Sequence, residues 1–174
     1  QKNTAVGRLA GANITTASDN TVVGADALFV NTTGASNTAI GMSALNANTT
    51  ANHNTAVGYT ALLANTTGTR NVAVGSKALD TSTTGDQNTA VGYGAMDANT
   101  TGSNNVAIGD AALASNTTAS NNVAVGDDAL KFNTTGFDNV AVGSTAGDAL
   151  TTGNGNTAVG YGSLGSDTLG DRAV

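Results

Sequence analysis

Few side chains in this sequence are suited to acid–base, nucleophilic or metal chemistry. Its 174 residues include one histidine, His53, no cysteine, and twelve acidic residues that are all aspartate. A lone imidazole without a cysteine or a second histidine makes neither a catalytic triad nor a zinc site. The aspartates do not recur at a fixed spacing, so they do not form a calcium-binding roll. The sequence therefore predicts no catalytic residues, no metal and no cofactor.

Two other residue types point to binding rather than to catalysis. Tyr59, Tyr93 and Tyr161 either form an aromatic patch for a glycan or a host surface, or merely cover the surface of the fold. Asn-Thr-Thr triplets match the pattern for N-glycosylation, although a turn would use the same residues. These triplets begin at Asn31, Asn48, Asn65, Asn99, Asn116 and Asn133.

Charge and hydropathy argue against two kinds of partner. The net charge is −6, with only six basic residues, which is unfavourable for contact with a phosphate backbone. No apolar run approaches the roughly 18 residues of a membrane-spanning helix. We expect neither nucleic-acid binding nor a membrane span.

All of these residues are placed by a seventeen-residue repeat that fills residues 1–174 as a single array. Each repeat starts with a pentad such as Asn54-Thr55-Ala56-Val57-Gly58, and we number positions within the repeat from 1, the leading Asn, to 17. The ten repeats follow one another without insertion or deletion and begin at Asn3, Asn20, Asn37, Asn54, Asn71, Asn88, Asn105, Asn122, Asn139 and Asn156. Position 1 is always Asn, position 4 Val or Ile, position 5 Gly and position 13 Thr. Positions 6, 7, 10, 11, 16 and 17 vary freely and carry every basic residue.

The repeat predicts an all-β fold, a parallel β-solenoid of ten seventeen-residue coils. Seventeen residues are too few for helical repeats of about 33–47 residues, and the β-branched pentad favours a strand. The Ala-Leu pair at positions 8 and 9 predicts a second short strand, and Asn-Thr-Thr-Gly at positions 12 to 15 predicts a turn. Coils stacked about 4.8 Å apart would make a rod roughly 48 Å long.

Stacking of like positions predicts ladders of identical side chains. In the fourth repeat, Asn54 would join a side-chain amide ladder and Thr66 a hydroxyl ladder. Val57, Gly58 and Leu62 are the other structural positions of that coil.

Two repeats indicate where the core lies. Position 9, elsewhere Leu or Met, is glycine at Gly11 and Gly147, and each of these repeats has an aliphatic residue three positions later, at Ile14 and Leu150. Volume compensation inside the coil explains this coincidence.

The strand has two distinct sides. Positions 2 and 4, which are Thr or Val and Val or Ile, share one side, and the small residues at positions 3 and 5 share the other. Both sides look buried, and the smooth Ala and Gly side is expected to pack against another chain, because the core of a single coil is thin. Since the sequence starts and stops within repeats, we expect a segment of a longer fibre or a unit that stacks end to end.

Two stretches resemble known repeat families. Asn105-Val106-Ala107-Ile108-Gly109 resembles the S-V-A-I-G motif of YadA-like heads in trimeric autotransporter adhesins. The unit from Asn54 to Gly68 is similar to the repeats of bacterial and phage tail-fibre proteins. The resemblance covers the whole chain and implies a left-handed β-roll, three chains wound side by side, and an extracellular role. The coil of YadA-like heads is usually shorter, so Asn-Thr-Thr-Gly should add a different outer turn.

The sequence therefore predicts a structural or adhesive extracellular fibre segment rather than an enzyme. We expect it at a cell surface or in a virion fibre, as an adhesin head, a stalk or a tail-fibre-like rod. The expected partners are copies of itself, in a trimer or a filament, and a cell-surface glycan or host receptor. Two alternatives stay open: a self-assembling extracellular filament subunit, and an ice-binding solenoid, for which regular Thr rows are suited.

Overall fold

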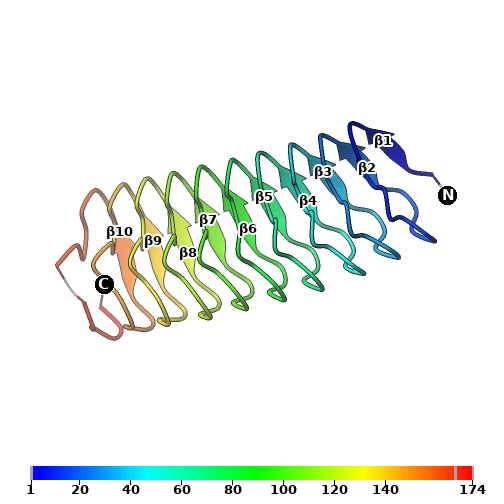
Figure 1. Ribbon diagram of the computed structural model, residues 1–174. Helices are drawn as coiled ribbons and strands as arrows, with labels where there is room; N and C mark the ends of the chain where they lie inside the picture. Colours follow the sequence, from blue (N-terminus) through cyan, green and yellow to red (C-terminus); the bar gives the residue numbers. More distant parts are fainter. Residues whose placement is uncertain (1, 167, 174) are drawn as a thin grey trace.

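The computed structural model describes residues 2–166 and 168–173, which form a slender rod of stacked coils (Figure 1). Its regular elements are ten strands of three residues each, and none of the described residues is helical. The strands pair in chain order into one ten-stranded sheet. They are β1 (Thr4–Val6), β2 (Thr21–Val23), β3 (Thr38–Ile40), β4 (Thr55–Val57), β5 (Val72–Val74), β6 (Thr89–Val91), β7 (Val106–Ile108), β8 (Val123–Val125), β9 (Val140–Val142) and β10 (Thr157–Val159).

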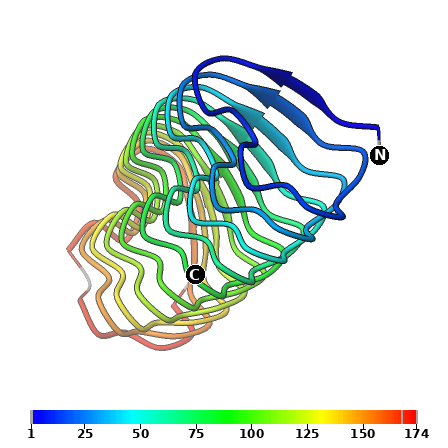
Figure 2. The same cartoon turned by 45° about the vertical axis from the view of Figure 1, so that its right-hand side comes forward.

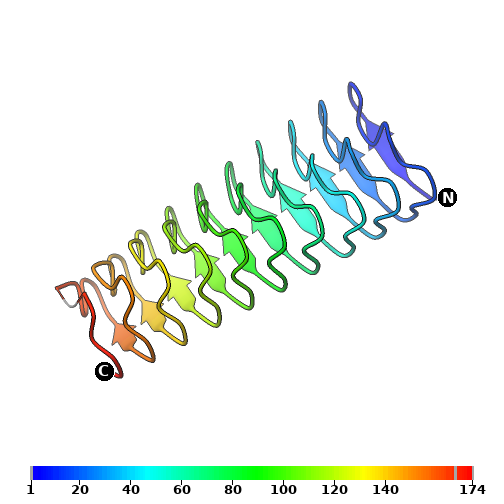
Figure 3. The same ribbon diagram turned by 60° about the horizontal axis from the view of Figure 1, so that its bottom comes forward.

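Neighbouring strands are parallel and in register at one repeat. Thr55 pairs with Val72, and Val57 pairs with Val74, so each residue lies beside its counterpart seventeen residues later. All ten strands occupy one side of the rod (Figure 3), and successive coils follow nearly the same path when the rod is seen closer to its axis (Figure 2). The predicted parallel β-solenoid with a seventeen-residue repeat is confirmed.

Hydrogen bonds between coils continue well beyond the strands. The backbone N–H of Lys77 donates to the carbonyl of Tyr59 at 2.9 Å, and that of Leu62 donates to the carbonyl of Ala78 at 2.9 Å. The predicted second strand at positions 8 and 9 is nevertheless wrong, because Leu62 lies in a turn with a φ of 54°. Inter-coil bonding there uses left-handed rather than extended backbone.

Left-handed backbone recurs at three positions of every coil. In the fourth coil these are Thr60, Leu62 and Arg70 at positions 7, 9 and 17, with φ values of 53°, 54° and 59°. Such a conformation costs a residue other than glycine roughly 1–2 kcal/mol. The inter-coil hydrogen bonds must offset this cost, and the resulting bends close the coil within seventeen residues.

Position 5 has a steric reason to be glycine in every repeat. Gly58 has a φ of 141°, and a Cβ added to it would lie 2.4 Å from the carbonyl oxygen of Gly75 in the next coil. Both the conformation and the close approach exclude a side chain.

The core is a narrow column inside the coils, formed by Ala at positions 3 and 8 and by Leu or Met at position 9. In the fourth coil Ala56, Ala61 and Leu62 are completely buried. Alanine suits position 3 because it leaves room for the leucine column.

The predicted volume compensation is present in the ninth coil. Leu150 is fully buried in the core. A Cβ added to Gly147 would lie 3.2 Å from Cδ1 of Leu150 and 3.1 Å from Cδ2 of Leu130. The leucine at position 12 therefore fills the space that position 9 leaves empty. In the first coil, Ile14 lies in the same way over Gly11.

Two buried columns of asparagine line the end of the coil where the chain turns back to the strand. Asn54 Oδ1 accepts the backbone N–H of Asn71 at 2.9 Å, and Asn54 Nδ2 donates to the carbonyl of Gly68 at 2.8 Å. Asn65, at position 12, donates to the same carbonyl at 3.0 Å and to Asn48 Oδ1 at 3.0 Å. In the six coils that have Asn at position 12, the carbonyl at position 15 thus accepts from both asparagine columns.

This bonding decides the role of the Asn-Thr-Thr triplets. The first asparagine of each triplet, at position 12, is completely buried and hydrogen-bonded within the solenoid, so the folded chain does not offer it for glycosylation. This holds for Asn31, Asn48, Asn65, Asn99, Asn116 and Asn133.

Position 13 forms the threonine column. Thr66 Oγ1 donates to the backbone carbonyl of Thr83 at 3.1 Å, and Thr49 Oγ1 donates to that of Thr66 at 3.1 Å. The hydroxyls therefore bond to backbone carbonyls of the next coil rather than to one another.

Candidate functional site

The outer side of the sheet carries branched side chains along the whole length of the rod. On β4, Ala56 is buried, whereas Thr55 and Val57 on either side of it point outward and are half-buried. The prediction that the Ala side of the strand faces a partner chain is therefore wrong, because alanine fills the core of its own coil. The Val and Ile side faces outward instead.

We call this surface the strand face, meaning positions 2 and 4 of all ten repeats. None of its twenty residues is charged. At position 4 it consists of Val6, Val23, Ile40, Val57, Val74, Val91, Ile108, Val125, Val142 and Val159. Nine steps of about 4.8 Å make it roughly 43 Å long. Position 2 is Thr in six repeats and Val in four, so the continuous apolar row is the one at position 4. An outward-facing apolar row of this length is typical of an interaction site.

The three tyrosines are exposed but do not converge. Tyr59, Tyr93 and Tyr161 have 48%, 58% and 86% of their surface exposed, and all occupy position 6, just beyond the strand. Tyr59 and Tyr93 are two coils apart, about 10 Å, and Tyr161 is four coils further. None of them lines the hollow formed by Phe137, Asp138, Asn154, Gly155, Asp171 and Arg172 or the one formed by Gly162, Leu164, Gly165 and Ser166. Glycan or receptor binding by these tyrosines stays a prediction.

A charged cluster lies on the eighth coil, away from the strand face. Lys131 Nζ is 2.9 Å from Asp128 Oδ1 and 5.8 Å from the centre of the Phe132 ring. The hydrogen bond to Asp128 raises the pKa of Lys131, and the charges of Asp127 and Asp110 add to this. The pair is solvent-exposed and adds little to stability.

Asp80 is the carboxylate whose surroundings oppose ionisation. Burial raises its pKa above the usual value, and repulsion from Asp97 at the same position of the next coil raises it further, whereas Lys77 opposes both effects. Within the described residues, Asp80 Oδ1 is buried and accepts no hydrogen bond.

Position 16 has a structural role that its variability concealed. Asp86 Oδ1 accepts the backbone N–H of Thr69 at 2.6 Å, and Ser103 Oγ accepts that of Asp86 at 3.0 Å. A polar side chain at position 16 thus caps the preceding coil. The available signal was composition, since position 16 has an oxygen-bearing side chain in every repeat except at Ala35 and Phe137.

Residues 2–166 and 168–173 contain no group of three or more His, Asp, Cys or Glu side chains placed to hold a metal ion. They also contain no helix that is long and apolar enough to span a membrane. His53 is exposed at position 17.

Comparison with known proteins adds no family to this description. No protein-family model, no curated protein and no solved structure matches the chain.

Proposed function

We propose that the chain is a segment of an extracellular structural or adhesive fibre, in which copies of the solenoid associate side by side through the strand face. The observation that carries this proposal is the retention of Val or Ile at position 4 in all ten repeats, although this side chain points away from the core.

Every other invariant position has a reason within the coil. Asn54 and Thr66 hydrogen-bond to neighbouring coils, and Gly58 has a conformation and a contact that exclude a side chain. Outward positions without such a role take charged residues, as at Arg8 and Lys77. An outward position that stays apolar through ten repeats therefore needs a partner from outside the chain.

A second copy fits this surface better than an unrelated protein does. The strand face repeats at the coil spacing, so two copies present branched side chains at the same interval and can interdigitate along the whole rod. It also has no charge that would be desolvated on contact. The resemblance to trimeric adhesin heads favours three copies.

The adhesive role is assigned to the variable positions. A solenoid held by ladders on all sides makes a stiff rod, and its varying side chains form the surface that a cell-surface glycan or host receptor would contact. A position on a cell surface or in a virion fibre follows from this role.

The experiment is sedimentation of the chain and of Val74→Asp at the same concentration. Val74 lies near the middle of the strand face, and a carboxylate there would be buried between copies. Ser76→Asp is the matched control, because it adds the same charge two residues away, at a position where the repeat already has Asp110 and Asp127.

We expect the unmodified chain and Ser76→Asp to sediment as the same oligomer. Val74→Asp should give a smaller species with an unchanged circular dichroism spectrum. A folded monomer for the unmodified chain, or an unchanged mass for Val74→Asp, would overturn the proposal. Electron microscopy of the same samples separates discrete rods from indefinite filaments.

Ice binding is retained as a second candidate because of one exposed row. Thr67 at position 14 is exposed, and equivalent threonines occupy nine consecutive coils: Thr16, Thr33, Thr50, Thr67, Thr84, Thr101, Thr118, Thr135 and Thr152. Thermal hysteresis or ice shaping by the folded chain is the measurement that selects this function.

A further inference from the structure

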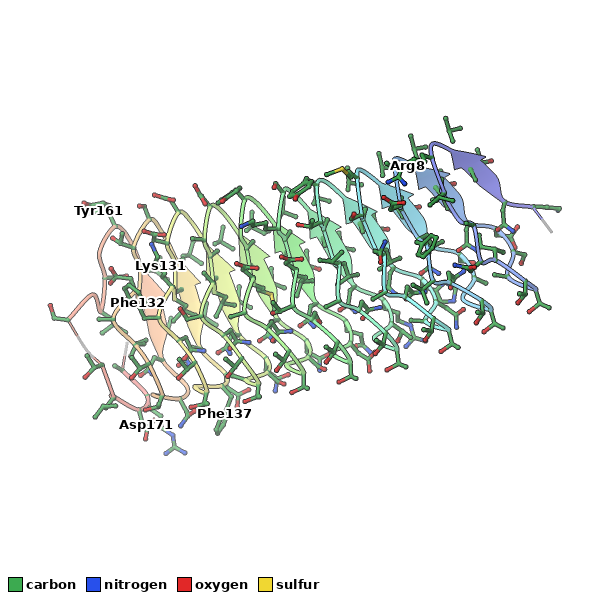
Figure 4. All side chains as sticks on the ribbon, viewed as in Figure 1. Arg8, Lys131, Phe132, Phe137, Tyr161 and Asp171 are labelled. Atoms are coloured by element: carbon green, nitrogen blue, oxygen red, sulfur yellow. The ribbon has the colours of Figure 1, made fainter. Side chains whose placement is uncertain are left out.

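The edge of the rod that carries positions 16 and 17 has a hollow near the C-terminal end. Its volume is about 490 Å³, and it is formed by three successive coils. The lining residues are Phe137, Asp138, Asn154, Gly155, Asp171 and Arg172. Figure 4 places Phe137 and Asp171 along one long edge of the rod, with Tyr161 and Arg8 along the opposite edge.

The hollow exists because the column at position 17 lacks one side chain. Gly155 is the only glycine at this position in the ten repeats. Asp138 and Arg172 flank it one coil to either side, so their backbones are about 10 Å apart. A Cβ added to Gly155 would lie 3.5 Å from Cγ of Arg172. The missing side chain opens a slot between an acidic and a basic residue.

The neighbouring column at position 16 forms the wall of the hollow. Phe137 is the only aromatic residue at this position, and half of its surface is exposed. Asn154 Oδ1 accepts the backbone N–H of Phe137 at 2.9 Å, and Asp171 Oδ1 accepts that of Asn154 at 2.7 Å. These bonds hold the amide and the carboxylate in place beside the ring.

The charged groups of the hollow are available to a ligand. Within the described part of the chain, neither the Asp138 carboxylate nor the Arg172 guanidinium forms an ion pair with another side chain. Asp171 uses Oδ1 for the backbone contact and for Asn154 Nδ2 at 3.3 Å, which leaves Oδ2 as a further acceptor.

We infer that this hollow binds a single pyranose residue of a glycan. The apolar C–H face of a sugar ring packs on an exposed aromatic ring, as Phe137 offers. The hydroxyls of the sugar donate to the carboxylates of Asp138 and Asp171 and accept from the guanidinium of Arg172, and charge-assisted hydrogen bonds of this kind are the stronger ones. A few convergent polar groups beside an apolar wall are typical of a small-ligand site.

The sequence departs from its own repeat at two adjoining positions of this hollow. Phe137 replaces the polar side chain usual at position 16, and Gly155 replaces the larger residue usual at position 17 in the very next coil. All six residues come from one chain and lie off the strand face, so the inference does not depend on self-association.

The test is saturation-transfer NMR on the unlabelled chain with methyl pyranosides of glucose, galactose, mannose and glucosamine, followed by titration of any that bind. We expect transfer to the ring protons of at least one of them. Phe137→Ala and Gly155→Asn should each weaken its binding at least tenfold. A preference for protonated methyl glucosaminide would assign recognition to the two carboxylates, and a preference for a neutral sugar would assign it to the shape of the slot.

Gly155→Asn is the decisive variant because it fills the slot without disturbing the backbone. Asn104 and Asn121 occupy position 17 of two other coils at φ values of 60° and 63°, close to the 68° of Gly155. Phe132→Ala is the control, since Phe132 lies in the same coil as Phe137 and is equally exposed.

Three results would overturn the inference. The first is the absence of saturation transfer to every sugar, and the second is equal binding by the unmodified chain and Gly155→Asn. The third is equal loss of binding in Phe132→Ala and Phe137→Ala, because that result indicates unspecific contact with exposed rings. The sedimenting mass of Gly155→Asn should match that of the unmodified chain, which keeps this test separate from that of the fibre.

Discussion

Replacing Ser82 with asparagine should repair a gap in the buried asparagine column at position 12. In the intact part of this column, Asn48 Nδ2 donates to Asn31 Oδ1 at 2.9 Å and to the carbonyl of Ala51 at 3.1 Å. The fifth coil has a serine instead, too short to continue the column. Within the described chain, Asn65 Oδ1 and Ser82 Oγ are consequently both buried without a hydrogen-bond partner.

The size of the effect follows from the bonds that the new amide would make. Its Nδ2 would donate to Asn65 Oδ1 and to the carbonyl of Gly85, and its Oδ1 would accept from Asn99, which now donates to Gly102 alone at 3.1 Å. Each net hydrogen bond contributes about 1 kcal/mol, and an unsatisfied buried group costs about 1–3 kcal/mol. We therefore expect Ser82→Asn to raise the free energy of unfolding by about 1–3 kcal/mol.

Thermal and guanidinium unfolding at one fixed protein concentration measures this difference. The melting temperature should rise by at least about 2 °C in a chain of this length. Ser36→Asn is the control, because it makes the same change at an exposed position and should alter stability by less than about 0.5 kcal/mol. Asn116→Ser, which opens a second gap, should destabilise. If Ser82→Asn is no more stable than the original chain, the bonding of this column does not contribute to stability as argued.

Three further predictions concern the coil. Leu62→Ala should cost about 2–5 kcal/mol because it empties the core, whereas Thr60→Gly should not destabilise, because glycine relieves the left-handed backbone at position 7; equal melting temperatures for the two variants would refute the core assignment. Gly75→Ala should cost about 3 kcal/mol or more, since its Cβ would lie 2.3 Å from a carbonyl oxygen of the next coil, and Gly94→Ala, with no atom within 4 Å, should cost only the roughly 1–2 kcal/mol of an alanine in left-handed backbone. Asp80→Asn should stabilise at pH 7, because the raised pKa of Asp80 means that ionisation costs stability above that pKa; the gain should shrink as the pH falls and vanish once the carboxyl is protonated in both folded and unfolded chains, and a gain that is independent of pH would contradict this origin.

The sequence by itself determined the periodic part of this structure. A period of seventeen residues without insertion places like residues beside one another in only one parallel register, so the single sheet and its pairing could be predicted. The ninth repeat located the core column, because it has Gly147 in place of the usual leucine at position 9 and Leu150 in place of the usual asparagine at position 12. Residues at equivalent positions share one environment, so the side chains of each coil must fill the same volume.

Only the tertiary structure decided which side of the strand faces inward. Alternation separates Ala56 from Val57 but does not say which of them is inside, and the space opposite the leucine column admits only the smaller side chain. The left-handed backbone at positions 7, 9 and 17 could not be predicted either. Thr60, Leu62 and Arg70 have no intrinsic preference for this conformation, and the hydrogen bonds between coils impose it. The hollow at Gly155 could not be predicted from the sequence either, because the three repeats that form it come together only when the coils stack.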